Sequence, residues 1–150
     1  MLEIIRTDSD NADFRYLVSL LDRDLKIRDG EEHSFYAQFN KLDKINHVIV
    51  AYKESKPVGS GALRAYTTDS AEVKRMFVDP QYRGQGIAKY VLAELEAWAK
   101  ELNFSSCILE TGKKQPEAIG LYQKAGYTVF PNYGQYENIE NSLCMRKELK

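Results

Sequence analysis

The chain has 150 residues, of which 43% are hydrophobic and 29% charged, and its 21 basic and 22 acidic side chains give a formal charge of −1. This length and balance argue against general disorder. They predict a single domain over residues 1–150 that can bury a full core without disulfide or metal staples. The near-neutral charge disfavours a protein that holds nucleic acid by bulk electrostatics.

The chain is expected to act in the cytoplasm, away from membranes. No apolar run approaches the roughly 18–20 residues needed to span a bilayer, and the first six residues carry an early acid, unlike a signal peptide. Cys107 and Cys144 lie far apart in apolar, strand-like stretches, which predicts buried free thiols in a reducing compartment. His33 and His47 stand in no ligand spacing, so no metal site is expected.

The first 45 residues predict a short strand over residues 2–6 and then helical structure. Asp8, Ser9 and Asp10 offer caps for a helix. Its apolar positions recur at helical spacing and are Phe14, Leu17, Val18, Leu20, Leu21 and Leu25. A weaker helix is expected over residues 31–42, where Phe35 and Phe39 stand four apart.

The middle of the chain changes to β-structure. Residues 47–52 are rich in β-formers, residues 54–56 signal a turn, and residues 57–64 resume as a strand, which together predict a hairpin. A third strand is predicted over residues 71–78. In it Ala71, Val73, Arg75 and Phe77 alternate with Glu72, Lys74, Met76 and Val78.

The second half predicts a strand–helix–strand unit. Residues 86–102 form the strongest predicted helix, with an apolar stripe made of Ala88, Val91, Leu92, Leu95, Trp98, Ala99 and Leu102. The strand over residues 105–110 would then run parallel to the third strand through a right-handed crossover. A helix from Pro116 to Ala125 and strands over residues 127–130 and 142–149 follow. The prediction is an α+β (α/β) fold, with an antiparallel N-terminal sheet joined to a parallel βαβ unit.

The segment 78–88 predicts an anion site. A strand ends, a short loop holds Arg83, Gly84 and Gly86, and the strongest helix begins. A helix N-terminus presents unpaired N–H groups and about half a positive charge, and glycines let an anion approach the backbone. No lysine–serine pair follows as in a Walker loop, and Lys89 replaces the third glycine of a dinucleotide fingerprint. The pattern favours a phosphate or pyrophosphate, and the alternative is a turn that binds nothing.

Two motifs resemble those of the GCN5-related N-acetyltransferase (GNAT) family. Gln81-x-x-Gly84-x-Gly86, after a strand that ends in Met76-Phe77-Val78, resembles the acetyl-CoA signature. Gln115-x-x-Ala118-x-x-Leu121-Tyr122-x-Lys124-x-Gly126-Tyr127 resembles the family's later motif. The resemblance covers residues 46–130. It implies a GNAT-like mixed central sheet with helices on both faces and an acetyl-CoA-dependent N-acetyltransferase.

The resemblance also implies which residues hold acetyl-CoA, the co-substrate. Backbone groups at the end of the third strand would bind the pantetheine like an added strand, in the gap where the two parallel strands splay. The glycine loop would cradle the pyrophosphate, and residues of the later motif would complete the site. The implied set is Met76, Phe77, Val78, Arg83, Gly84, Gln85, Gly86, Ile87, Ala88, Lys89, Gln115, Tyr122 and Lys124. Gln115 stands where the family often has asparagine.

Tyr122 stands where the family has its tyrosine acid. Amide formation from a thioester expels a thiolate, and a thiol near pKa 8.5 leaves more easily if it is protonated. A tyrosine near pKa 10 can supply that proton. The alternative is a core tyrosine that packs with Leu121 or Ile119.

Two carboxylates, Glu72 and Glu110, are candidates for taking the proton that the acceptor amine must lose. A lysine-like amine near pKa 10.4 is unprotonated in only about one part in 10³–10⁴ at pH 7, so a carboxylate acting directly or through water would help. The resemblance favours Glu72. Alternatively, Glu72 pairs with Lys74 on the same strand face, Glu110 binds a cationic substrate or pairs with Arg75, or an ordered water acts with no dedicated base.

The acceptor is expected to be a small-molecule amine, because the chain is small and nearly neutral. Residues 131–138 stand where the family has an acceptor-side segment, and their two tyrosines and one glutamate could line a cation-binding cleft or form a solvated loop. Neither cysteine follows a base or a helix N-terminus, so direct transfer is expected and not an acetyl-cysteine relay. The alternative function is a non-catalytic acyl-CoA-binding or regulatory module on the same fold. A homodimer is a further expectation that the family allows.

Overall fold

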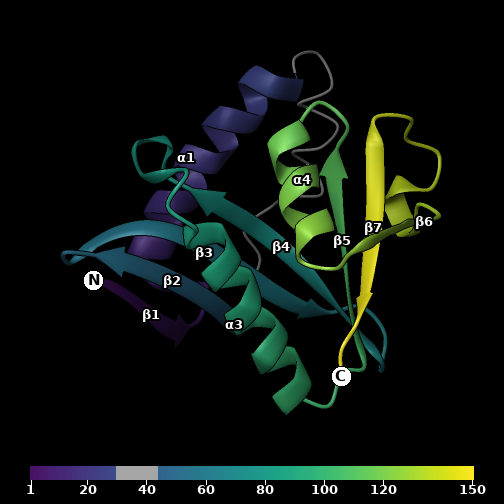
Figure 1. Cartoon of the computed structure of the whole chain (residues 1–150), viewed down its shortest axis with the longest axis horizontal. Helices are drawn as coiled ribbons and strands as arrows, with labels where there is room; N and C mark the ends of the chain where they lie inside the picture. The colour runs from purple at the N-terminus through teal and green to yellow at the C-terminus, as the bar shows by residue number, and fades with distance from the viewer. Residues whose placement is uncertain (30–43) are drawn as a thin grey trace.

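The computed structural model describes the backbone of residues 1–29 and 44–150 and the side chains of residues 1–24 and 44–150. Its strands form one seven-stranded sheet in the order β1-β2-β3-β4-β5-β7-β6 (Figure 1). The strands are β1 (Leu2–Thr7), β2 (His47–Lys53), β3 (Lys56–Ala65), β4 (Ser70–Val78), β5 (Ser106–Gly112), β6 (Thr128–Phe130) and β7 (Ser142–Glu148). The helices are α1 (Ala12–Asp29), α3 (Ile87–Glu101) and α4 (Pro116–Lys124), with short 3-10 turns η2 (Pro80–Tyr82) and η3 (Gly134–Tyr136).

The predicted architecture is confirmed. β1 to β4 pair antiparallel in chain order, and β4 pairs parallel with β5. The crossover between these two strands contains α3, and β7 then pairs antiparallel with both β5 and β6. The helix expected over residues 31–42, with Phe35, Phe39 and His33, lies outside the described residues.

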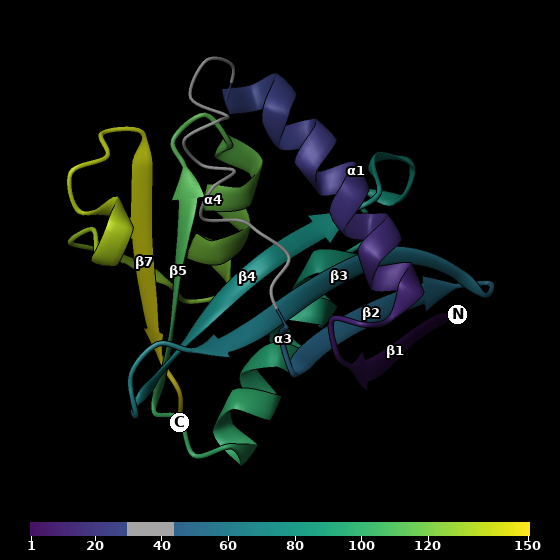
Figure 2. The same cartoon turned by 180° about the vertical axis from the view of Figure 1, so that it is seen from behind.

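Helices cover both faces of the sheet, and each face has its own apolar core. α1 lies on one face (Figure 2), where Phe14, Leu17 and Val18 pack against Val48 and Phe77. α3 and α4 lie on the other face. That core is larger and includes Val91, Leu92, Leu95, Ile49, Leu63, Val73, Leu109 and Tyr122. The sheet is therefore a buried central layer, which explains the long apolar runs of β2 and β5.

The start of α1 differs from the prediction, because Asn11 caps the helix and not Asp8, Ser9 or Asp10. The Asn11 side chain accepts a hydrogen bond from the Phe14 N–H at 2.9 Å, as an N-cap does. The Ser9 hydroxyl instead accepts from the Ile45 N–H at 2.8 Å, and Asp8 accepts from the Asp10 N–H at 2.9 Å. These earlier polar residues therefore shape the turn that leads from β1 into the helix.

The predicted alternation along β4 is wrong beyond Lys74, because the strand contains a bulge. Arg75 has a φ of +60°, and the pairing with β3 shifts register between Ser60 and Ala62. The extra residue turns the rest of the strand over. Val73 consequently packs in the core beneath α3, whereas Phe77 packs in the core beneath α1.

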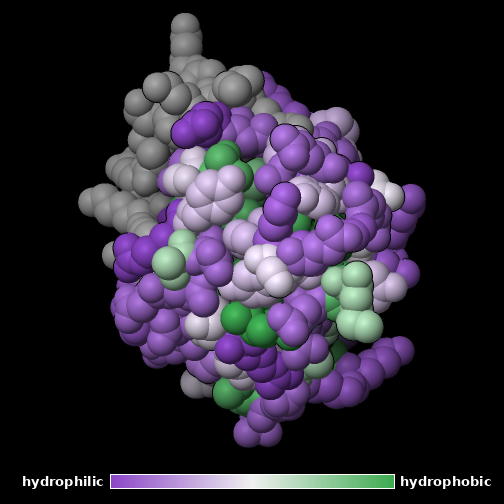
Figure 3. All heavy atoms as spheres, turned by 90° about the vertical axis from the view of Figure 1, so that its left-hand side faces the viewer, coloured by the Kyte–Doolittle hydropathy of each residue, from purple (hydrophilic) through white to green (hydrophobic). Residues whose placement is uncertain are grey.

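The face that carries β1 and the β2–β3 turn is mainly hydrophilic. The hydrophobic residues visible there form small, separate areas within the described part of the surface (Figure 3). In the described residues no helix is long and apolar enough to cross a membrane.

Gly61 provides a test of the packing between β3 and α3. An added Cβ would lie 2.7 Å from the Met76 sulfur, 2.8 Å from Leu95 and 3.0 Å from Val91. Overpacking a core costs about 1–3 kcal/mol, so we expect Gly61→Val to lower the free energy of unfolding by about that amount in a urea titration. Gly120→Ala is the control, because a Cβ there meets nothing within 4 Å and alanine favours the helix. An unchanged unfolding midpoint for Gly61→Val would contradict this packing.

Candidate active site

The candidate site begins where β4 and β5 separate. The two parallel strands pair only at Ser70–Ser106, Ala71–Cys107 and Glu72–Ile108, and they diverge towards their C-terminal ends (Figure 1). A bulge bends the strand that contains it, and the bulge at Arg75 follows directly after the last paired positions. The splay that the family resemblance implied is therefore present.

The larger of two cavities, about 310 Å³, lies between the end of β4, the start of α3 and α4. Most of the predicted cofactor residues line it, namely Met76, Phe77, Val78, Arg83, Gly84, Gly86, Ile87, Ala88, Lys89, Gln115 and Tyr122. Gln85 and Lys124 are exposed and are not among the lining residues, and Gln85 accepts a hydrogen bond from Lys53. Sequence reasoning missed the contributions of Asp24 and Tyr82.

The glycine loop has the backbone shape that an anion site requires. Gly84 and Gly86 have φ values of +82° and +80°, in the region that favours glycine. Gly86 is the N-cap of α3 and provides no side-chain cap, so the first N–H groups of this helix are available to a ligand. The side chain of Asp79 stabilises the preceding turn by accepting from the Gln81 N–H at 3.0 Å.

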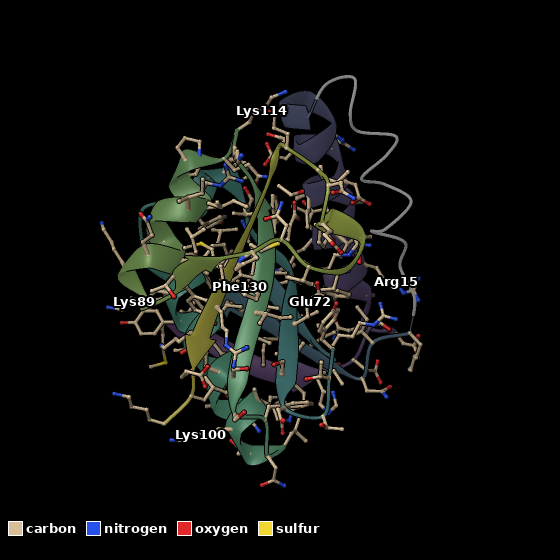
Figure 4. The ribbon with its side chains drawn as sticks, turned by 90° about the vertical axis from the view of Figure 1, so that its right-hand side faces the viewer. Arg15, Glu72, Lys89, Lys100, Lys114 and Phe130 are labelled. Atoms are coloured by element: carbon tan, nitrogen blue, oxygen red, sulfur yellow. The ribbon has the colours of Figure 1, made fainter. Side chains whose placement is uncertain are left out.

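Arg83 links the loop to two other elements. Its Nε donates to the Val78 carbonyl oxygen at 2.9 Å, and its Nη2 lies 3.6 Å from the Asp24 carboxylate on α1. The guanidinium group also lies over the Phe77 ring, 5.6 Å from its centre. An anionic ligand in this cavity would compete with Asp24 for the charge of Arg83. Lys89 extends outward from α3 at the edge of the molecule (Figure 4).

The smaller cavity, about 110 Å³, adjoins the larger one. It is lined by charged residues of β4 and β5, among them Glu72, Lys74, Arg75 and Glu110. Five residues line both cavities, namely Leu21, Met76, Gln115, Ala118 and Tyr122. The two cavities therefore meet beside Tyr122.

Tyr122 is both a core residue and a cavity residue. Its side chain is buried, and its ring packs 5.8 Å from the Tyr127 ring. Burial raises the pKa of Tyr122, and the charge of Glu110 raises it further. The phenol therefore stays protonated at neutral pH and can donate its proton or a hydrogen bond at the junction of the cavities.

Both candidate carboxylates face the smaller cavity, and each accepts a hydrogen bond from a hydroxyl. Tyr133 donates to Glu72 at 2.6 Å, and Ser142 donates to Glu110 at 2.7 Å. Glu72 is 6% exposed and lies within the molecule beside β4 (Figure 4). Arg75 is a cation that lines the same cavity, and it donates to Asp22 on α1 at 3.1 Å.

Lys74 is a cavity residue that sequence reasoning treated only as a partner for Glu72. Burial lowers the pKa of Lys74, while the charge of Glu72 acts in the opposite direction. The smaller cavity thus holds charges of both signs close to the junction.

Of residues 131–138, Tyr136 lines the smaller cavity, whereas His47, Cys107 and Cys144 are among the lining residues of neither cavity. His47 packs edge-on against Trp98, with ring centres 4.8 Å apart. Cys107 and Cys144 are both buried and free, as predicted. Within residues 1–24 and 44–150, no group of three or more His, Cys, Asp or Glu side chains could hold a metal ion.

Comparison with known proteins agrees with this geometry. A family model described as "Acetyltransferase (GNAT) family" matches residues 14–127. An IAA acetyltransferase of Azospirillum brasilense is 38% identical over 102 residues, which cover 67% of each chain. A Klebsiella pneumoniae protein, provisionally named as an acyl-CoA N-acyltransferase, has a TM-score of 0.84 and 28% identity, with 100% of this chain and 99% of that chain covered. The PaiA N-acetyltransferase of Thermoplasma acidophilum, solved in complex with coenzyme A, shares the fold with a TM-score of 0.72 at 20% identity and 99% coverage of both chains.

The fold, the paired cavities and these matches define the class of protein as an acyltransferase that uses acetyl-CoA. The chain belongs to the acetyltransferase (GNAT) family. It is an N-acetyltransferase, of enzyme class EC 2.3.1, that transfers an acetyl group from acetyl-CoA to an acceptor.

The two thiols provide a test of the expectation that no acetyl-cysteine relay operates. Burial raises the pKa of the Cys107 thiol to about 12 and that of the Cys144 thiol to about 11, so both thiolates are scarce at pH 8. We expect the native protein to react with Ellman's reagent at least about 100-fold more slowly than glutathione, and both cysteines to react after unfolding in guanidinium. A fast thiol in the native protein would contradict the buried positions.

Proposed function

We propose that the protein transfers the acetyl group of acetyl-CoA directly to the primary amine of a small molecule. The observation that carries this proposal is the meeting of two cavities beside Tyr122 and Met76. The larger cavity ends at a helix N-terminus and suits the pantetheine and pyrophosphate. The smaller cavity is lined by Glu72 and Glu110, whose charges attract an ammonium group, and its volume of about 110 Å³ suits a compact acceptor.

The proposed cofactor contacts follow the lining residues of the larger cavity. The backbone of Met76 and Val78 would pair with the pantetheine as an added strand does. The N–H groups at the start of α3 would hold the pyrophosphate, with charge from Arg83 and Lys89. Gln115 lines both cavities and would lie near the thioester. We assign no contact to Gln85 and Lys124, which are absent from both linings.

The reaction would proceed through a tetrahedral intermediate. The neutral amine attacks the thioester carbonyl carbon, a backbone N–H of β4 polarises the carbonyl oxygen, and the C–N bond forms. The C–S bond then breaks, and Tyr122 protonates the departing sulfur. The amine passes its proton to Glu72 or Glu110, so that the protons balance. Free buried thiols fit a reducing compartment such as the cytoplasm.

Acetyl-CoA binding tests the cofactor half of the proposal. We expect the wild-type protein to bind acetyl-CoA with micromolar affinity in calorimetry. Gly84→Glu should weaken binding by at least about tenfold, because it places a side chain at a φ of +82° and a negative charge beside the pyrophosphate. Gly120→Ala, which lies outside the cavity lining, should bind like the wild type. No wild-type binding at millimolar acetyl-CoA would overturn the cofactor assignment.

Replacing Tyr122 tests the proposed acid. In an assay with the best amine from a panel, Tyr122→Phe should lower kcat by about 10²–10⁴-fold with little change in acetyl-CoA affinity. Because burial raises the pKa of Tyr122, its ionisation should not limit the wild-type rate up to pH 9. Tyr16→Phe, on the exposed side of α1, is the matched control.

Two results would change the assignment in different ways. A Tyr122→Phe variant with the wild-type rate would remove the acid role and leave acetyl transfer in place. A wild-type protein that binds acetyl-CoA and acetylates no amine of the panel would instead favour the non-catalytic acyl-CoA-binding module.

A further inference from the structure

One segment of the chain contacts both candidate carboxylates. This segment, residues 131–142, is called here the β6–β7 segment and contains η3 and the first residue of β7. Its Tyr133 hydroxyl donates to Glu72 at 2.6 Å, and its Ser142 hydroxyl donates to Glu110 at 2.7 Å. Tyr133 and Glu72 are 61 positions apart in the sequence, so tertiary structure alone makes this contact.

The Tyr133 ring is held on several sides. It packs edge-on against Tyr66 and Tyr136, at 4.9 Å and 5.8 Å between ring centres, and stacks on Phe130 at 5.8 Å. The backbone of the segment is held from within by Asn132. The Asn132 side-chain nitrogen lies 3.0–3.2 Å from the carbonyl oxygens of Tyr136, Ile139 and Ser142. The hydroxyl is therefore presented to Glu72 from a fixed position.

Tyr133 can only be a donor in this contact. Burial raises the pKa of Tyr133, and the charge of Glu72 and its hydrogen bond raise it further, so the phenol stays neutral throughout the working pH range. A hydrogen bond from a neutral donor stabilises the charged form of a carboxylate, and a buried charge without such donors is costly. The contact thus gives the buried Glu72 carboxylate a hydrogen-bond donor and restricts its rotamer.

The environments of the two carboxylates favour different roles. Glu72 is on β4, the strand whose Met76 lines the junction of the cavities. Glu110 is on β5 and acts on Tyr122, whose pKa its negative charge raises. Glu72 therefore belongs to the strand that leads to the junction of the cavities, and we take it as the proton acceptor.

We propose that Tyr133 is a positioning residue for acetyl transfer, because its hydroxyl holds the Glu72 carboxylate oriented to accept the proton of the acceptor amine. The proposal rests on the acetyl transfer proposed above. It assigns the proton-accepting role to Glu72. It also makes acetyl transfer depend on the β6–β7 segment, which lies outside both sequence motifs. Tyr133 acts through Glu72 and touches neither the thioester nor the amine.

Other polar and charged groups also lie around Glu72. They are Arg64 on β3, Lys74 and Arg75 on β4, Glu110 on β5, Tyr136 in the β6–β7 segment, and Asp22 on α1 through Arg75. Substitution of Tyr133 by phenylalanine changes none of these groups. The effect of the missing hydroxyl can therefore be separated from theirs.

The experiment compares Tyr133→Phe with two matched variants, using acetyl-CoA and the best amine from the panel. Tyr133→Phe should lower kcat by about 10- to 100-fold, the effect of one hydrogen bond to a charged group, while KM for acetyl-CoA stays unchanged. Tyr66→Phe removes a hydroxyl from the same aromatic cluster, and Ser142→Ala removes the donor to Glu110. Neither should lower kcat as much as Tyr133→Phe does.

Two further variants show whether the effect passes through Glu72. In a Glu72→Gln background the additional Tyr133→Phe change should have no further effect on kcat. Glu72→Asp, which retracts the carboxylate by one methylene from both the Tyr133 hydroxyl and the amine, should lower kcat while KM for acetyl-CoA stays unchanged. Because Glu72→Asp leaves Tyr133 intact, it tests the proposal even where Tyr133→Phe folds poorly.

Three outcomes would overturn the positioning role while acetyl transfer stands. These are a kcat of Tyr133→Phe equal to that of Tyr66→Phe, a loss of kcat caused by Ser142→Ala and not by Tyr133→Phe, or an equal loss from Tyr133→Phe in the Glu72→Gln background. A wild-type protein that acetylates no amine would overturn the proposed function itself, and the role of Tyr133 with it.

Discussion

Strand β4 cannot keep both of its neighbours along its whole length, and the site depends on this constraint. It pairs with β3 on both sides of its bulge, but with β5 only over its first three residues. Backbone N–H and C=O groups in a buried strand need partners. Beyond the bulge at Arg75, the stretch from Met76 to Val78 lines a cavity instead of pairing with β5. The same break in pairing therefore opens the cavity and leaves a strand edge to which an extended pantetheine can add.

Helix α1 completes the site from the other face of the sheet. Leu21 lines both cavities. Two aspartates that follow it on the helix contact arginines, one on β4 and one in the loop after β4. Asp22 accepts from Arg75 at 3.1 Å, and Asp24 lies 3.6 Å from Arg83. The positive charges of Arg75 and Arg83 are thus balanced by carboxylates of a helix from the N-terminal part of the chain. The glycine loop keeps its helix N-terminus for an anionic ligand.

Buried tyrosines have a common chemical role in this molecule. Burial raises the pKa values of Tyr122, Tyr127 and Tyr133, and nearby carboxylates raise them further. Tyr127 donates to Glu96 at 2.9 Å, as Tyr133 donates to Glu72. A neutral phenol in a low-dielectric interior is a strong hydrogen-bond donor and stays protonated at neutral pH. This chemistry suits Tyr122 as a proton source at the junction of the cavities and Tyr133 as a fixed donor behind Glu72.

Local sequence patterns determined the order of elements and the nature of the cofactor site. Apolar spacing predicted α3, and a turn between two β-rich runs predicted the hairpin of β2 and β3, because both depend on residues close together in the chain. The two glycines before α3 predicted the anion loop for the same reason. The strand–helix–strand order predicted the parallel pairing of β4 with β5. Only the tertiary structure decided where β4 bulges, because Arg75 takes its positive φ to satisfy pairing with β3, a requirement that the residues of β4 do not encode locally. It likewise decided that Tyr133 reaches Glu72 and that Asp24 reaches Arg83, since these contacts join distant segments and depend on how the sheet brings its loops and helices together.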